Sequence, residues 1–138
     1  MSRKNVSESV TVASKLSMVS VLVSDMKKAK EFYAEKLGLQ IATDYRRNDD
    51  NWWVTITFPG GGPSITLARS STTDNEPPKP GTVSFYFSTS DIAAAHQALN
   101  EKGLKTDEIR DDLYGPGSGV KFFQLNDPDG NQVTFAQE

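Results

Sequence analysis

The residue types that most often carry out chemistry in proteins are scarce in this sequence of 138 residues. The chain contains one histidine, His96, and no cysteine. The lack of cysteine excludes disulfides, thiolate zinc sites and cysteine nucleophiles. A single histidine cannot form a two-histidine metal site within one chain. Any metal would therefore have to be held mainly by oxygen ligands.

The ionisable groups that remain favour structural roles over catalytic ones. His96 lies one turn after Ile92 on the flank of an expected helix, at the boundary between core and solvent. The acidic residues at positions 107–112 are interrupted by Arg110, which favours a solvated rim over a site for a cationic ligand. We therefore name no catalytic residue from the sequence.

Aromatic residues are the side chains best suited to hold a ligand. Trp52 and Trp53 are adjacent, so on a strand they point to opposite faces and at most one of them lines a pocket. We expect Trp53 to do so, the alternative being a tryptophan in the core or a dimer interface. Tyr114 lies in the glycine-rich segment 112–119, which either covers a cavity or simply connects two strands.

The first element that positions these residues is a strand followed by a helix. Residues 18–23 are apolar and β-branched at alternating positions, which predicts a strand. Asp25 is a typical N-cap, and apolar residues recur at helical spacing as far as Leu37. Gly38 is suited to end the helix, which we expect over residues 25–37.

The same arrangement returns later in the chain. A strand at 83–87 precedes the cap residue Asp91, a helix begins at Ile92, and Gly103 is placed to end it. Asp91 lies 66 residues after Asp25, and the apolar positions of the two helices match at the same offset. Matching caps, apolar faces and helix ends together indicate an internal repeat.

Three further strands are expected after each helix. They span residues 39–46, 52–58 and 64–69 in the first half, and residues 104–110, 120–126 and 132–137 in the second half. The Pro-rich polar segment 70–81 is a linker. We predict a mobile tail at 1–15 and one α+β domain at 16–138, built from two βαβββ modules at 16–69 and 82–138.

Composition restricts the partners. The 15 basic and 18 acidic residues, with a pI near 5.2, give no basic surface for nucleic acid. No segment is apolar enough to cross a membrane or to act as a signal peptide, so we predict a cytoplasmic protein that binds neither nucleic acid nor membrane.

Several short motifs in a fixed order resemble those of the vicinal oxygen chelate superfamily, which includes glyoxalase, bleomycin-resistance and extradiol-dioxygenase proteins. The motifs occupy residues 23–26, 32–33, 37–39, 91–96, 103–104 and 127–131. The resemblance extends from about Leu16 to Gln137. It implies two curled mixed sheets around a cup-shaped cavity, and it implies a homodimer.

Metal-dependent relatives hold their ligands on the first and fourth strands of each module. The resemblance places those positions at Met18, Thr66, Ser84 and Thr134, none of which is His, Glu or Gln. Hydroxyl and thioether groups are poor ligands for a hard divalent cation. We therefore expect no metal and no other cofactor.

Strand alternation completes the expected binding site. If Val19, Val21 and Val23 pack on the helix, their neighbours line the concave side, and the same rule applies to the later strands. The expected ligand-binding set is Met18, Ser20, Trp53, Thr66, Ser84, Tyr86, Tyr114, Phe122 and Thr134.

The function that follows is metal-independent binding or sequestration of a small, partly aromatic or hydrophobic molecule, as in drug-binding resistance proteins. One alternative is a glyoxalase-like lyase or isomerase, either metal-dependent or metal-free, the latter using Tyr86 or a rim carboxylate. Another is a module that serves mainly in interaction or regulation.

Overall fold

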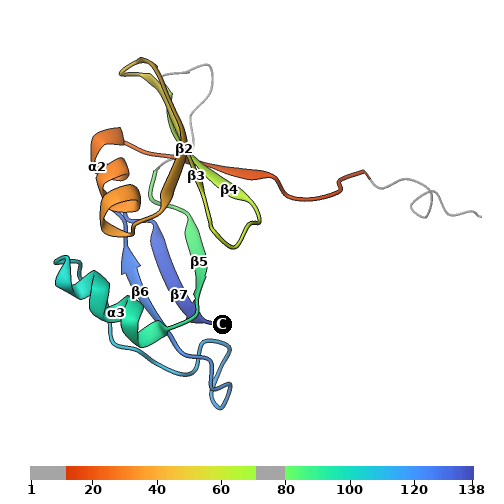
Figure 1. Ribbon diagram of the computed structural model, residues 1–138, viewed down its shortest axis with the longest axis vertical. Helices are drawn as coiled ribbons and strands as arrows, with labels where there is room; N and C mark the ends of the chain where they lie inside the picture. Colours follow the sequence, from red (N-terminus) through yellow and green to blue (C-terminus); the bar gives the residue numbers. More distant parts are fainter. Residues whose placement is uncertain (1–11, 71–79) are drawn as a thin grey trace, which may run out of the picture.

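A computed structural model describes residues 12–70 and 80–138, apart from the side chain of Ser70. Most of the expected tail (1–15) and of the expected linker (70–81) therefore lies outside the described residues. Residues 12–17 form an extended arm that leads away from the body of the molecule (Figure 1). Within the described part of the chain, no helix is both long and apolar enough to cross a membrane.

The first module forms a mixed four-stranded sheet in the order β1-β4-β3-β2. The strands are β1 (Met18–Leu22), β2 (Gln40–Asn48), β3 (Asn51–Thr57) and β4 (Ser64–Ser70). β1 pairs in parallel with β4, and the other pairs are antiparallel. The side chain of Asp25 accepts a hydrogen bond from the Lys28 amide, which confirms it as the helix N-cap.

The second module forms a three-stranded sheet in the order β5-β7-β6. Its elements are β5 (Ser84–Thr89), α3 (Ile92–Glu101), β6 (Phe122–Asn126) and β7 (Gln132–Gln137). Asp91 caps α3 through a bond from the Ala94 amide, as the repeat predicts. Gly103 has a φ of 83°, which suits its place at the end of the helix.

The expected strand at 104–110 is not formed. This segment meets β6 through one isolated bridge, between Arg110 and Phe122. The cause is the side chain of Asp107, whose carboxylate accepts the Gln124 amide at 2.6 Å in place of a backbone carbonyl. A side chain that competes with the backbone in this way interrupts a regular ladder.

The expected helix at 25–37 is two helical segments of different pitch. α2 (Met26–Lys30) is an α-helix, whereas η1 (Glu31–Lys36) is a π-helix in which the Leu37 amide donates to the Phe32 carbonyl at 2.9 Å. The adjacent side chains of Phe32 and Tyr33 are both buried, an arrangement that fits a widened turn.

One hydrophobic core joins the two modules. The helices lie on the same side of the two sheets in Figure 1, and the core fills the space between them. On β3, Trp52, Val54 and Ile56 are buried in this core, while Trp53 is 36% exposed on the opposite face. The expected alternation is confirmed, and neither sheet closes into a barrel.

A buried polar junction also links the modules. We use this name for Tyr33, Asp127 and Asn131. The Tyr33 hydroxyl donates to the Asp127 carboxylate at 2.6 Å, and the Asn131 side-chain amide donates to it at 2.7 Å. Burial, and then the bond to Asp127, raise the pKa of Tyr33 far above its usual value, so the hydroxyl keeps its proton and remains a donor.

The junction fixes how the chain enters the second sheet. The backbone amides of Asp129 and Asn131 also donate to Asp127, at 2.9 and 2.8 Å. The Asn131 carbonyl oxygen of the side chain accepts the Val83 amide at 2.8 Å, just before β5. The turn at 127–131 is thus tied to η1 on one side and to β5 on the other.

Candidate ligand-binding surface

The face of the first sheet opposite the core carries two neighbouring aromatic side chains. Tyr45 on β2 pairs directly with Trp53 on β3, and their ring centroids lie 5.5 Å apart at 32°. Tyr45 is 58% exposed and Trp53 is 36% exposed. Two offset, half-exposed rings of this kind present a flat apolar surface to solvent.

A row of hydroxyl groups lies beside these rings. Thr66 on β4 is opposite Thr55 on β3 and Ser20 on β1. Thr66 is only 6% exposed; its hydroxyl donates to the Met18 sulfur and lies 3.2 Å from that of Thr55, which is the more accessible of the two threonines. We call Met18, Ser20, Tyr45, Trp53, Thr55 and Thr66 the aromatic platform. It combines apolar rings with a few fixed polar groups and no charged side chain.

The corresponding face of the second sheet is more polar and partly covered. Thr134 is fully buried and accepts a hydrogen bond from the Gln124 side-chain amide at 3.1 Å. Phe122 was expected to line an open cup, but it is only 5% exposed. It is covered by the Arg110 guanidinium, 4.4 Å from the ring centroid. A ligand on this face would meet the cation before the ring.

Between the two sheets lies a cleft of about 810 Å³, which is within the range of small-molecule sites. Its wall contains Ser84 and Tyr86, two residues of the expected site, from the free edge strand β5. Apolar residues from both modules form most of the remaining wall. They are Leu16, Val19, Leu39, Phe58, Ile65, Val83, Phe85, Phe87 and Phe135.

Two residues that the sequence singled out lie elsewhere. Tyr114 is 77% exposed on the loop that follows Arg110, so its side chain projects into solvent. His96 stacks edge-on against the buried Phe123 at 4.9 Å, and its Nε2 lies 2.9 Å from the Asp107 carbonyl oxygen. These contacts give His96 the structural position expected for it.

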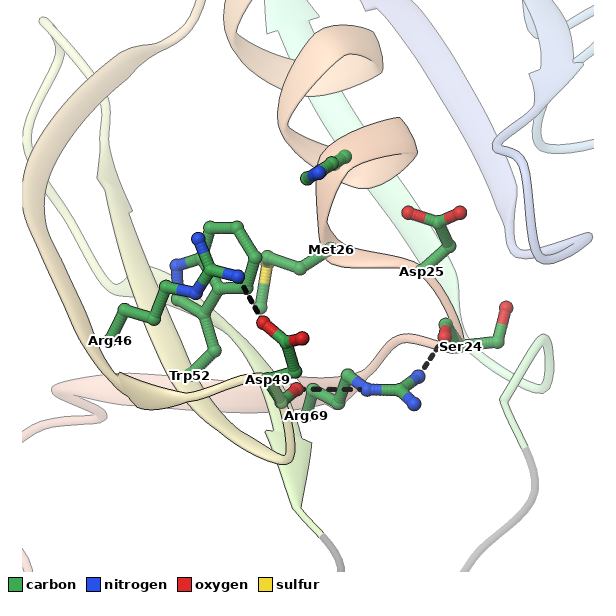
Figure 2. Close-up of a pocket in the computed structure, with 8 residues that line it drawn as sticks. Ser24, Asp25, Met26, Arg46, Asp49, Trp52 and Arg69 are labelled. Carbon is green, nitrogen blue, oxygen red and sulfur yellow. Dashed lines mark hydrogen bonds and ion pairs between the residues drawn. The ribbon is translucent and has the colours of Figure 1, made fainter.

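A smaller pocket of about 220 Å³ lies on the helix side of the first sheet (Figure 2). Its two arginines are engaged with neighbouring groups. Arg46 pairs with Asp49, and Arg69 donates to the carbonyl oxygens of Asp49 and Ser24. Both guanidinium groups are therefore engaged, and their contacts link the β2–β3 turn to the segment that precedes α2.

The sequence analysis missed two residues of these surfaces. Tyr45 lies opposite Trp53 because the β2–β3 register shifts between Arg46 and Asn48; a regular hairpin closed by Asn48–Asn51 would place Arg46 there, so the turn indicates only the neighbourhood of Tyr45. Arg110 carries no such signal, since its position above Phe122 depends on the irregular segment that precedes β6.

Comparison with known proteins identifies the family of this chain. The model of the Glyoxalase/Bleomycin resistance protein/Dioxygenase superfamily matches residues 15–135. The chain belongs to this superfamily. The uncharacterized protein YwkD of Bacillus subtilis (strain 168) is 30% identical over 117 residues, which cover 80% of this chain and 87% of that protein.

Solved structures of the superfamily share the fold. TnmS3, an antibiotic binding protein from Streptomyces sp. CB03234, has a TM-score of 0.70 at 28% identity, covering 93% of this chain and 98% of its own. A member from Sphaerobacter thermophilus DSM 20745 has a TM-score of 0.73 at 26% identity, covering 93% of this chain and all of its own. Antibiotic binding and other glyoxalase-family proteins are thus both among its structural relatives.

The superfamily includes metal-dependent enzymes, but the residues here do not fit a metal. The four corresponding positions supply a thioether from Met18 and hydroxyls from Thr66, Ser84 and Thr134. Two of these groups, Met18 and Thr66, already bond each other. Within residues 12–70 and 80–138, no three His, Cys, Asp or Glu side chains are grouped so as to hold an ion. This set lacks the carboxylates or imidazoles that a divalent cation needs.

Protein purified without a chelator is therefore expected to contain much less than one divalent ion per chain. Elemental analysis for Zn, Ni, Mn and Fe tests this. The double variant Met18→His/Thr66→Glu supplies two stronger ligands and serves as the comparison. A stoichiometric ion in the unmodified protein would contradict the reading of these positions.

Proposed function

We propose that the protein binds a small, flat, partly aromatic molecule on the aromatic platform, without a metal and without chemical conversion. The observation that carries the proposal is the exposed pair of rings, Tyr45 and Trp53, beside the hydroxyl row of Thr55 and Thr66. Such a surface suits stacking on a planar ligand, with one or two hydrogen bonds to set its orientation.

Two further facts support binding over catalysis. TnmS3, a relative of 28% identity, is an antibiotic binding protein. The platform residues carry no histidine, carboxylate or lysine that would serve as a general acid or base. Sequestration of a toxic compound, and hence resistance to it, is the physiological role that fits these features. The lack of cysteine fits a reducing cytoplasm as its place.

Replacing Trp53 with alanine tests the platform. Planar drug-like compounds are screened by tryptophan fluorescence and thermal shift, and the binders are titrated against both proteins. Loss of the stacked ring should weaken binding by about 1–3 kcal/mol, the cost of removing a well-packed aromatic contact. The fold should persist, because Trp53 lies outside the core.

Gln97→Ala is the control for affinity. Gln97 is exposed on α3, away from the platform and the cleft between the sheets, so its loss should leave the affinity unchanged. A screen that finds no binders would favour the interaction-module alternative. If the affinity of the binders is unchanged in Trp53→Ala, the aromatic platform is not the binding site.

We also propose a homodimer that forms along the edge strand β1. Met18 is 50% exposed and Val19 is 38% exposed on β1, which is an edge strand of its sheet. Exposed apolar edge strands favour association. Light scattering should give twice the 15.1 kDa of one chain at micromolar concentration. A mass near 15.1 kDa would contradict the dimer.

A further inference from the structure

The cleft between the sheets differs in chemistry from the aromatic platform. Four phenyl rings converge in its wall. The ring centroids of Phe87 lie 5.3 Å from Phe58, 5.7 Å from Phe85 and 5.5 Å from Phe135. Phe58 belongs to the first module, whereas Phe85, Phe87 and Phe135 belong to the second. Both modules therefore contribute to the wall of the cleft.

The charge of the cleft has one sign. Of the described residues that line it, Glu138 alone has a charged side chain. Its main chain is held beside β5, because its backbone amide donates to the Thr89 carbonyl at 2.9 Å, and its side chain is exposed. The other polar groups in the wall are hydroxyls, including those of Ser84, Ser88 and Ser90.

Phenyl rings and a carboxylate together recognise a particular kind of ligand. The faces of aromatic rings attract cations, and an organic cation keeps an apolar surface that packs on the same rings. The carboxylate adds a charge of the opposite sign, and the net charge of −3 acts in the same direction. An organic anion gains the same apolar packing, but its charge is repelled by the carboxylate and by the ring faces.

We infer that this cleft is a second binding site, separate from the aromatic platform, that takes an apolar organic cation. The apolar body of the ligand packs between Phe58 and Phe87, and its ammonium group lies toward Glu138. The volume of about 810 Å³ accommodates a molecule of one to three fused rings. The site does not depend on the proposed function of the platform, since the two share no residue.

The test uses two naphthalene probes of similar size and opposite charge, 2-naphthylmethyl-trimethylammonium and 2-naphthylacetate. Calorimetry at low ionic strength should show the cation bound about five- to tenfold more tightly than the anion. In NMR spectra, the cation should shift the amide signals of residues 84–90. Equal affinities, or shifts confined to β2 and β3, would overturn the inference.

Substitutions separate the charge from the apolar wall. Glu138→Gln keeps the shape of an exposed side chain and should reduce the preference for the cation to about twofold or less, the remainder coming from the ring faces. Ser84→Lys adds a positive charge to the wall and should reverse the preference. Glu108→Gln, an exposed carboxylate outside the cleft, should leave the preference unchanged. If Glu138→Gln keeps the full preference, the carboxylate plays no part and the inference fails.

Two further outcomes distinguish this site from its alternatives. Trp53→Ala should weaken ligands of the platform and leave the cation unaffected, so either proposal can fail without the other. A second copy of the chain is the competing occupant of the cleft. If the signals of residues 84–90 change with protein concentration and not with the cation, the cleft is an interface and no ligand site.

Discussion

Replacing Asp127 with alanine is expected to lower the free energy of unfolding by about 3–5 kcal/mol. The carboxylate accepts four hydrogen bonds, from the Tyr33 hydroxyl, the Asn131 side chain and the backbone amides of Asp129 and Asn131. Alanine leaves these donors without their acceptor in a place that water does not reach, since Tyr33 and Asn131 are fully buried. Urea denaturation followed by circular dichroism measures the loss.

Asp129→Ala is the control for this substitution. Asp129 belongs to the same turn but is half-buried, and it accepts bonds from the amide and hydroxyl of Ser24. Its loss should cost about 1 kcal/mol or less. Tyr33→Phe removes a single donor and should fall between the two. Equal losses of unfolding free energy for Asp127→Ala and Asp129→Ala would show that the buried junction contributes no more to stability than the exposed part of the turn.

Trp52→Ala is expected to destabilise the fold by about 3–5 kcal/mol, the usual cost of truncating a buried tryptophan. Trp52 is 7% exposed, and its indole N–H donates to the Asp44 carboxylate at 2.7 Å. The Lys30 ammonium, and to a lesser extent this indole, lower the pKa of Asp44, so the acceptor is ionised at neutral pH. The Arg46 guanidinium covers the ring at 4.2 Å.

Trp53→Ala provides the matched control on the next position of the same strand. Its ring is more exposed and contacts Tyr45, so the loss of stability should be about 1 kcal/mol. Thermal unfolding of both variants gives the comparison. We therefore expect Trp52→Ala to lower mainly the stability and Trp53→Ala to lower mainly the affinity for ligand. A larger stability loss for Trp53 would contradict the assignment of faces on β3.

Local patterns in the sequence predicted those features that depend on neighbouring residues. The caps at Asp25 and Asp91, the glycine helix ends and the opposite faces of Trp52 and Trp53 each follow from a few adjacent positions. These features indicate the internal repeat and the order of the elements along the chain, apart from the strand expected at 104–110. They are also enough to identify the superfamily.

Features that depend on distant contacts could not be found in this way. The hydrogen bond from Tyr33 to Asp127 joins residues 94 positions apart, and the local sequence around neither residue predicts it. The segment at 104–110 has the pattern of a strand, but the Asp107 side chain takes the place of its backbone. The cleft depends on how the two sheets sit side by side, and its phenyl rings come from three separate segments, the turn after β3, β5 and β7.

The polar junction makes the two halves of the chain unequal. At the offset of 66 residues that relates the two helices, Tyr33 corresponds to Leu99. Asp127, the first residue after β6, corresponds to Phe58, the first residue after β3. A chain built from two first halves would bury two phenols with no carboxylate to receive them. A chain built from two second halves would bury two carboxylates with no phenol. The two halves share the order of their elements, but one supplies the buried donor and the other the buried acceptor. Neither half can therefore replace the other.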